Sequence, residues 1–553
     1  MLDLLPPSNR LMSNQPKDDD NSALPRRDFI KVAGTGAGAL LIGGSAAVGA
    51  ATPGPKATRS VRSASASPEI VVIGAGLWGS FTAMNLQAMG ARVTMVDIYG
   101  PGNARATSGD ETRGVRSSYG DRPGELGELW MLWAREAMTK WLAFDDEYGK
   151  YLRLNLFHVT GDLILRQDWD NFQLRCKVWW DKNKIPYHVM NPDDVRKAFP
   201  VINMDDINAV LYEPDAGVLR ARRAAQAGAA VFEKLGGRIV IGRATPSKIS
   251  NGRLEEISLD TGATLRADTF VYCVGPWLGK TFPDLFAKKT RTPMGYVVYF
   301  GTPIGDYRFT YPNLPSYNFP GVTGWAALPV DNRGFRVRGA ERAPTPPNQP
   351  VATANTNGPA TDAGSNLANV AGGATPAGGS PAGARGRGGN GDNGGNGGNG
   401  GGGRGNGGGR GGQGGGQGQN QQDVPPEQQD PDTSDRWADQ SRVEGSRRFV
   451  AHRFPLMAKA PVAQTHSCHY ESTSSGNFII DKHPQWANVW IAAGGNAEGA
   501  KFSPKIGDYV AHRVMGTVLP NIDPLFRIPE KEYEPPPPPA SDSTKRAPAK
   551  PPF

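Results

Sequence analysis

The chain has 553 residues, a formal net charge of +8 and three cysteines. Its length allows two packed domains, whereas three cysteines without a CxxC pair or a Cys/His spacing exclude a disulfide framework and indicate no metal site. Much of the positive charge falls in terminal and low-complexity segments. It is therefore weak evidence for an anionic partner of the folded core, and we expect no nucleic acid partner.

Residues 1–67 are predicted to form an export signal and a linker. Arg26 and Arg27, followed by Phe29 and Lys31, precede the uncharged run Val32–Ala50 of mainly small and apolar residues. This arrangement is typical of an export signal, and the arginine pair is typical of the twin-arginine pathway. The run is too short and too rich in Gly and Ala for a good membrane span. We expect the twin-arginine export machinery as a partner and a periplasmic or extracellular location; the alternative is a chance arginine pair before an Ala/Gly linker.

The next segment predicts a βαβ unit that binds a dinucleotide. A strand at Ile70–Ile73, a helix at Ser80–Met89 and a strand at Arg92–Val96 follow one another, and Asp97 closes the second strand. The turn before the helix consists of Gly74, Ala75, Gly76, Leu77, Trp78 and Gly79. The first glycine allows the tight turn, the second allows a pyrophosphate to approach the backbone, and the third allows the helix to pack on the strand. An acid in the place of Asp97 bonds ribose hydroxyls. The alternative is a glycine-rich corner of any α/β protein.

Two later segments are expected to lie outside the folded core, which leaves residues 68–343 and 429–528 as the core. Residues 344–428 are dominated by Gly, Asn, Gln and Pro with arginines spaced through glycine. Such a segment buries too little apolar surface to repay its ordering entropy, so we expect a disordered insert. Arg-Gly tracts can bind nucleic acid weakly, but a solvated loop or a surface-adhesive tether is favoured. The Pro-rich residues 529–553 are expected to form an extended, mobile tail.

The three cysteines differ in their surroundings. Cys176 and Cys273 lie in a predicted helix and an apolar run, which favours small buried side chains. Cys468 lies between His466 and His469 in a polar neighbourhood. Positive charge near a thiol makes it a better nucleophile, so Cys468 is a candidate functional residue.

Four segments resemble one group of flavoenzymes. They are Val71–Asp97, Ser108–Gly120, Glu213–Leu219, and the Cys-His-Tyr run from Cys468 followed by Asn477–Pro484 and Asn488–Lys501. Through them the chain resembles the monomeric sarcosine oxidase and N-methyl-amino-acid oxidase group of the D-amino-acid-oxidase-like FAD enzymes, which includes fructosyl-amine oxidases.

The resemblance implies an α/β fold with two discontinuous domains. One is a Rossmann-like FAD-binding domain at about 69–120, 215–280 and 466–515. The other is an α+β substrate domain of mixed or antiparallel sheet at about 150–200, 285–343 and 430–465.

The resemblance also implies roles for individual residues. In the family, the cysteine of Cys-x-Tyr is bonded to the 8α-methyl group of the flavin; this position is Cys468, and an ordinary buried cysteine is the alternative. Arg116 and Lys501 would hold a substrate carboxylate, with structural ion pairs as the alternative. Tyr470 would close the substrate pocket or simply pack. The further positions expected beside FAD are Ser108, Thr112, Arg113, Gly275, Trp277, Gly494, Gly495 and Lys501.

The chain also departs from the family pattern. Arg336 stands where the family has a lysine that speeds the reaction with oxygen. Ala340 stands where the family has a histidine, and the segment Ser108–Gly109 lacks another histidine that the family often has there. Glu498 replaces a histidine near Lys501, where it would disfavour an anionic substrate or pair with a substrate ammonium.

We therefore expect an enzyme with FAD that oxidises the C–N bond of a secondary amine or an N-substituted amino acid to an imine, which hydrolyses. Oxygen is the expected electron acceptor, and no metal is expected. One alternative is a dehydrogenase that passes electrons to a quinone or another carrier. An alternative of another class is an exported flavoprotein that acts mainly as a surface-binding module. We expect a monomer.

Overall fold

The computed structural model describes residues 67–122, 124–328, 333–339, 430–434, 436–438 and 440–533. The predicted export signal up to residue 66, the predicted insert, Ala340 and the tail beyond residue 533 lie outside these ranges. Among the residues described, no helix combines the length and the apolar character that a membrane span requires.

A six-stranded sheet contains the predicted βαβ unit. Its order is β21-β22-β13-β1-β2-β9, and all neighbours are parallel except β21, which runs antiparallel to β22. The strands are β1 (Glu69–Ile73), β2 (Arg92–Asp97), β9 (Arg238–Ile241), β13 (Thr269–Tyr272), β21 (Ile479–Lys482) and β22 (Val489–Ala493). The apolar run of β1 is buried on both faces, which is the usual pattern of a central parallel strand.

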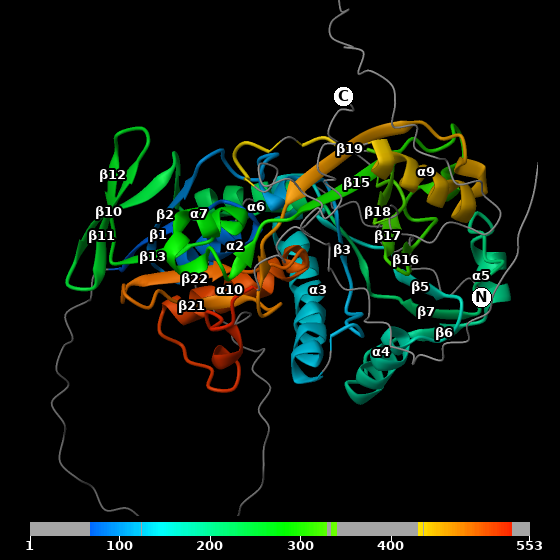
Figure 1. Ribbon diagram of the computed structural model, residues 1–553, viewed down its shortest axis with the longest axis horizontal. Helices are drawn as coiled ribbons and strands as arrows, with labels where there is room; N and C mark the ends of the chain where they lie inside the picture. Colours follow the sequence, from blue (N-terminus) through cyan, green and yellow to red (C-terminus); the bar gives the residue numbers. More distant parts are fainter. Residues whose placement is uncertain are drawn as a thin grey trace, which may run out of the picture. The chain divides into compact units, whose positions relative to one another are not determined.

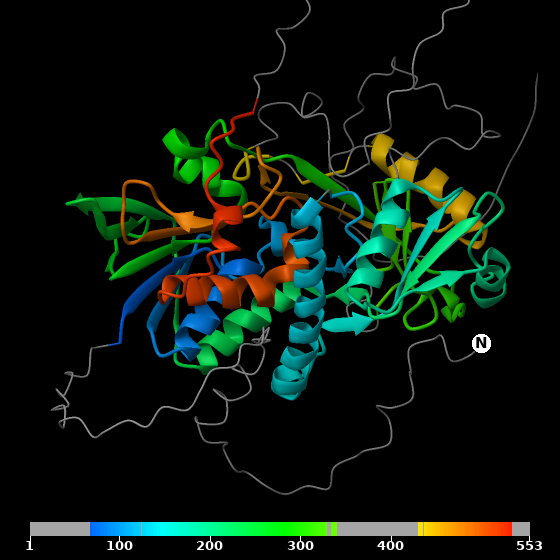
Figure 2. The same ribbon diagram turned by 90° about the horizontal axis from the view of Figure 1, so that it is seen from below.

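Three helices cover one face of this sheet, and Figure 2 shows them side by side: α2 (Leu77–Ala88), α6 (Ala221–Lys234) and α10 (Ser503–Val514). The helix α2 begins at Leu77, three residues before the predicted start at Ser80, because Gly76 already takes the extended conformation of an N-cap. The other face packs against α7 (Leu278–Thr281), α8 (Pro283–Phe286) and the small sheet β10 (Ala244–Ser250), β11 (Arg253–Leu259) and β12 (Thr264–Arg266).

An eight-stranded sheet forms the second part of the fold (Figure 1). Its order is β19-β15-β18-β17-β16-β5-β7-β6, with β16 and β5 parallel and the other neighbours antiparallel. The strands are β5 (Asp162–Arg166), β6 (His188–Met190), β7 (Ala209–Glu213), β15 (Met294–Phe300), β16 (Ser316–Phe319), β17 (Val322–Trp325), β18 (Phe335–Arg338) and β19 (Val462–His469). The helices α5 (Pro192–Ala198) and α9 (Gln440–Arg453) share its core.

A parallel Rossmann-like sheet together with a discontinuous mixed sheet confirms the predicted fold class. The remaining helices are α3 (Gly124–Leu152) and α4 (Asn171–Lys182). The remaining strands are β3 (Arg113–Val115), β4 (Phe157–Val159) and β8 (Gly217–Leu219), which form one sheet, and β14 (Thr290–Arg291) and β20 (Ser472–Thr473), which form another.

The structure differs from the prediction near three expected segment ends. The expected boundary at residue 466 falls inside β19, so His466–His469 pair with β15 in the eight-stranded sheet. The start of the expected mobile tail contacts the core instead, because the Tyr533 hydroxyl lies 3.0 Å from Ser472 Oγ and the Arg291 guanidinium lies 4.0 Å from the Tyr533 ring.

The third difference is the segment Asp430–Ser434, which we expected in the substrate domain. Lys280 lies 2.9 Å from Asp430 and 2.6 Å from Asp432, and Arg105 donates to backbone carbonyls of the segment. These bonds hold the segment on the side of the six-stranded sheet.

Candidate active site

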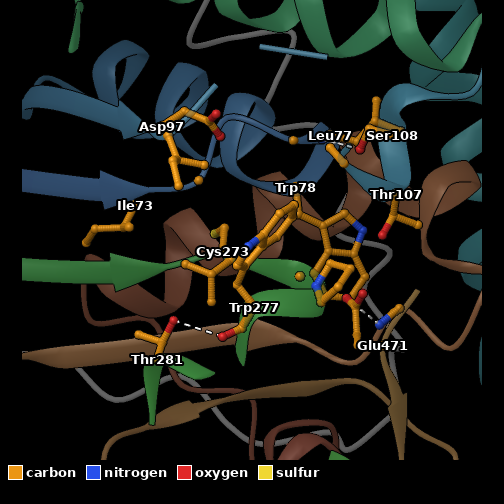
Figure 3. Close-up of a pocket in the computed structure, with 18 of the residues that line it drawn as sticks. Ile73, Leu77, Trp78, Asp97, Thr107, Ser108, Cys273, Trp277, Thr281 and Glu471 are labelled. Carbon is orange, nitrogen blue, oxygen red and sulfur yellow. Dashed lines mark hydrogen bonds between the residues drawn. The ribbon is translucent and has the colours of Figure 1, made fainter. Parts of the chain in front are cut away.

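The ends of β1, β2 and β13 open into a groove of about 290 Å³ beside the first turn of α2. Figure 3 shows Trp78 and Trp277 in its middle, with Asp97 and Glu471 on different sides. The predicted cofactor residues that line it are Gly74, Gly76, Leu77, Trp78, Asp97, Ser108, Arg113, Gly275, Trp277 and Gly495, and Tyr470, predicted at the substrate pocket, lines it as well. Six predicted cofactor residues do not line it: Ala75, Gly79, Thr112, Cys468, Gly494 and Lys501.

The glycines of the turn are required by close backbone contacts. Gly74 has a φ of +106°, and a Cβ there would lie 2.3 Å from the carbonyl oxygen of Cys273. A Cβ at Gly79 would lie 1.8 Å from the Gly74 carbonyl oxygen. Gly79 therefore sets the distance between helix and strand, as its place in the motif predicts.

Asp97 and Ser108 hold the backbone around the groove. The Asp97 carboxylate accepts from the backbone N–H groups of Ala75, Tyr99 and Gly100 at 2.7–2.9 Å. Burial raises the pKa of Asp97, although these bonds oppose the shift. Since a carboxylate has about four acceptor positions, room remains for a hydroxyl. The Leu77 N–H donates to Ser108 Oγ at 3.0 Å, so Ser108 satisfies a free donor of the first helical turn.

The far wall of the groove is fixed by backbone and side-chain bonds. The Trp78 indole donates to the Gly499 carbonyl at 2.9 Å, and the Trp277 indole donates to Asp432 at 2.8 Å. The Gly495 N–H donates to Glu471 at 3.0 Å, and burial raises the pKa of Glu471. The groove thus combines open backbone with aromatic walls, and Glu471 was not identified from the sequence.

A smaller cavity of about 60 Å³ adjoins the groove. Residues 107, 113, 470, 497 and 500 line both spaces, so the two lie side by side. The inner cavity brings together the predicted residues Arg113, Arg116, Arg336, Cys468, Tyr470 and Lys501.

Cys468 lies at the inner cavity beside a cationic side chain. This side chain is an arginine and not one of the two neighbouring histidines, which the sequence suggested. Burial lowers the pKa of both His466 and His469 to about 4, so these side chains are neutral at neutral pH. Instead, Arg113 Nη2 donates to Cys468 Sγ at 3.3 Å. The structure therefore provides Arg113 as the cationic side chain that contacts the Cys468 sulfur.

Asp110 binds two of the arginines of the inner cavity. It forms ion pairs with Arg113 and, at 3.2 Å, with Arg336, and it accepts from the Tyr299 hydroxyl at 2.9 Å. Burial opposes the charge of Asp110, but both arginines outweigh it and hold the pKa of this carboxyl far below its usual range. Arg336 is 2% exposed and lies 4.1 Å from the Trp325 ring. Its charge is therefore neutralised by a partner that the sequence did not reveal.

Lys501 is also paired. Its ammonium donates to the Tyr119 hydroxyl at 2.8 Å and forms an ion pair with Glu498. Burial lowers the pKa of Lys501 to about 8, although Glu498 opposes the shift. Burial also disfavours the charge of Glu498, but Lys501 and Arg116 outweigh it and lower its pKa to about 2. At neutral pH the pair is ionised, and Glu498 compensates the charge on Lys501.

Arg338 also lines the inner cavity, although it was not predicted as a site residue. Phe335 and Val337 of β18 belong to the hydrophobic core, whereas Arg336 and Arg338 line the inner cavity. This is the two-residue alternation of a strand, and the run Gly334–Gly339 displays it. Thr112, by contrast, accepts from the Trp325 indole at 3.0 Å and faces away from both spaces.

Comparisons with known proteins agree with this arrangement. The family model described as FAD dependent oxidoreductase matches residues 69–370. L-saccharopine oxidase of Schizosaccharomyces pombe is 40% identical over 70 residues, which are 13% of this chain and 16% of that protein. N-methyl-L-tryptophan oxidase of Yersinia pestis is 23% identical over 224 residues, which are 40% of this chain and 57% of that protein. The chain thus spans less than two thirds of the length of either relative.

The deglycating fructosamine oxidase Amadoriase II of Aspergillus fumigatus has the same fold, with a TM-score of 0.59 and 18% identity over 84% of this chain and 89% of that one.

Proposed function

The chain belongs to the FAD dependent oxidoreductase family, and from this membership we propose that it oxidises the C–N bond of a secondary amine or an N-substituted amino acid. One observation carries the proposal: the groove around the glycine turn adjoins a small cavity rich in cations, with Cys468 beside Arg113 at the wall of that cavity. The oxidised substrate is an imine, which water hydrolyses to an amine and a carbonyl compound.

FAD fits the groove. Gly74 and Gly76 expose backbone at the start of α2, where N–H groups and the helix dipole favour a pyrophosphate. Asp97 keeps an acceptor position for a ribose hydroxyl. The chemistry that FAD supplies when bound is the acceptance of a hydride equivalent from the carbon next to the amine nitrogen. We propose that Cys468 Sγ holds the flavin covalently at its 8α-methyl group.

The inner cavity orients the substrate. Arg116 holds the carboxylate, because a guanidinium grips a carboxylate with two parallel hydrogen bonds. Lys501 adds positive charge, although Glu498 and Tyr119 already bind it. Tyr470 lines both the groove and the cavity, where it limits the access of water.

Oxygen is the proposed electron acceptor, and one observation favours a slow reaction with it. Arg336, which stands in the position of the oxygen-activating lysine of the family, forms an ion pair with Asp110. A compensated cation stabilises a developing negative charge less than a free one does. A dehydrogenase that passes electrons to a quinone or another carrier is therefore the second candidate.

Anaerobic flavin bleaching tests the proposal. The purified protein is mixed with N-methyl amino acids, cyclic imino acids and glycated amines without oxygen, and air is then admitted. Bleaching by an amine supports amine oxidation, and peroxide formed on admission of air supports the oxidase. Bleaching without peroxide supports the dehydrogenase. A flavin that dithionite bleaches and none of these amines bleaches contradicts amine oxidation.

We also propose export of a monomer through the twin-arginine machinery, on the sequence of residues 26–31. This pathway moves folded proteins, which suits an enzyme that binds its cofactor before export. Replacing Arg26 and Arg27 with lysine should retain the flavoprotein in the cytoplasm, as cell fractionation would show. The wild-type protein found in the cytoplasm would contradict this proposal, and elution from a sizing column as a dimer would contradict the monomer.

A further inference from the structure

The inner cavity has more cationic side chains than its own carboxylates can pair. Its lining contains Arg113, Arg116, Arg336, Arg338 and Lys501 but only the carboxylates Asp110 and Glu498. Arg113 and Arg336 bind Asp110, and Lys501 binds Glu498. Arg116 and Arg338 are left over.

These two arginines have no hydrogen bond or ion pair from their side chains to any residue that the structure describes. Arg116 follows β3, and its Nη1 would lie 3.2 Å from a Cβ at Gly114. Arg338 ends β18 and points with Arg336 to the cavity side of the strand. The two guanidinium groups therefore reach the same cavity from different elements of the fold.

Both side chains are partly exposed, and a guanidinium that faces a cavity without an ion pair to a described residue can offer its N–H donors to an anionic ligand. Burial lowers the pKa of Arg338; Arg336 and Arg113 add to this shift, whereas Tyr470 and Glu498 oppose it. For Arg116, burial also opposes the charge, but Glu498 and Asp162 outweigh it and raise the pKa. Asp162 and Glu498 act on Arg116 from beyond 4 Å, since neither forms an ion pair with it.

We propose that the substrate carries two carboxylates, one held by Arg116 and the other by Arg338. This inference rests on the proposed amine oxidation and names its substrate class, a compact dicarboxylic secondary amine. Two carboxylates reduce the charge surplus of the cavity from three to one, and each meets a guanidinium that offers paired N–H donors. Glu498 then lies near the amine nitrogen or near Lys501 rather than against an unpaired carboxylate. The cavity volume of about 60 Å³ limits the substituents to short chains.

The test uses ligands that differ by one carboxylate and cannot be oxidised as amines. Thiodiacetate and methylthioacetate have a thioether in place of the amine, and their binding to the oxidised holoprotein is followed by the change in flavin absorbance. We expect thiodiacetate to bind at least about tenfold more tightly at constant ionic strength, since a charge-assisted pair of hydrogen bonds contributes on the order of 1.5–3 kcal/mol. Equal binding of the two ligands by the wild-type protein would overturn the proposal, and this comparison needs no variant.

Variants then assign the second carboxylate to its arginine. Arg338→Gln should remove the preference for thiodiacetate and leave the affinity for methylthioacetate within about threefold, while Arg338→Lys should retain part of the preference. The matched control is Arg308→Gln, which removes an exposed arginine paired with Asp306 and should change nothing. If Arg338→Gln weakened both ligands alike, Arg338 would serve the cofactor or the fold, and the assignment would be wrong.

Amines that match the two thioethers test the two-carboxylate site and the proposed amine oxidation separately. Iminodiacetate and sarcosine are the amine counterparts, and we expect anaerobic flavin reduction at much lower concentrations of iminodiacetate. A preference for thiodiacetate without reduction by either amine would keep the two-carboxylate site and refute amine oxidation. Reduction by sarcosine together with equal binding of the two thioethers would keep amine oxidation and refute the two-carboxylate site.

Discussion

The groove and the inner cavity adjoin one another, yet they are built from different kinds of contact. The groove is formed by backbone at the glycine turn and by aromatic walls, and its two acids, Asp97 and Glu471, are bound to backbone N–H groups. The inner cavity is formed by charged side chains that neutralise one another in part, as in the Asp110 and Glu498 pairs. The first arrangement suits a cofactor that stays bound, and the second suits a charged ligand that enters and leaves.

This difference predicts that changes in the two regions have separate effects. Changes in the groove should alter flavin content and stability at any pH. Changes in the cavity, apart from those at the proposed attachment residue Cys468, should alter ligand affinity, pH dependence and electron transfer while the flavin stays in place.

The largest effect is expected from Gly79→Ala in the groove. A methyl group there would lie 1.8 Å from the Gly74 carbonyl oxygen, which forces α2 away from β1. We expect destabilisation by about 3 kcal/mol or more and protein purified without flavin, measured by thermal unfolding and absorbance. Gly279→Ala is the control, because its Cβ would meet only Thr290 Oγ1 at 3.4 Å. Full flavin content in Gly79→Ala would show that the turn does not set the groove.

Cys468→Ser should abolish acid-stable flavin, because an alcohol does not replace the thiolate as the nucleophile at neutral pH. The fold should remain, and some FAD should bind without a covalent bond, as absorbance before and after acid precipitation would show. Cys273→Ala is the control, since Cys273 lines the groove but is not the predicted site of attachment, and this change should not affect attachment. Acid-stable flavin in Cys468→Ser would place the linkage elsewhere.

A smaller, pH-dependent effect is expected from Lys501 in the cavity. Burial lowers its pKa to about 8, so the ammonium loses its proton, and its charge, as the pH rises through this value. The affinity for methylthioacetate should therefore be constant below pH 8 and fall by up to about tenfold per pH unit above it. The carboxyl of this ligand does not titrate in that range.

Lys501→Arg sharpens this prediction, because arginine stays protonated. The loss of affinity above pH 8 should disappear in this variant, while its flavin content stays unchanged. An identical pH profile in both proteins would assign the titration to another group.

The smallest effect is expected from Arg336→Lys. A lysine keeps the charge as a compact ammonium and can order a water that the planar guanidinium cannot, so flavin reoxidation by air should become a few-fold faster. Anaerobic reduction should stay nearly unchanged. If the rate of reoxidation stayed the same, or if the rate of anaerobic reduction changed by a comparable factor, Arg336 would not be part of the oxygen site.

The sequence predicted the groove better than the cavity for a physical reason. The glycine turn and Asp97 act through local backbone geometry, so spacing along the chain determines their contacts. The ion-pair partner of Arg336 is Asp110, which lies 226 positions away in the chain, and no local sequence pattern indicates such a pair. Thr112 is a second contact that local sequence did not predict, because its hydroxyl accepts a hydrogen bond from the distant Trp325.

The fold class was predictable because alternating strands and helices in order imply a parallel sheet. Segment ends were less predictable, since long-range contacts decide them. The ion pairs of Lys280 hold Asp430–Ser434 beside the six-stranded sheet, and the ring of Tyr533 holds the start of the tail. The direction of Arg338, however, could have been inferred from the alternation in β18.

The central claim is that an amine is oxidised in the inner cavity by a flavin held in the groove. Anaerobic titration of the wild-type protein and Arg116→Gln with an N-substituted glycine tests it most directly, with dithionite as the measure of total flavin. The account predicts complete bleaching of the wild-type flavin by the amine, and bleaching of Arg116→Gln only at concentrations higher by a factor on the order of ten or more. Flavin that is fully reduced by dithionite but by no amine in the wild-type protein, or equal amine requirements in both proteins, would contradict it.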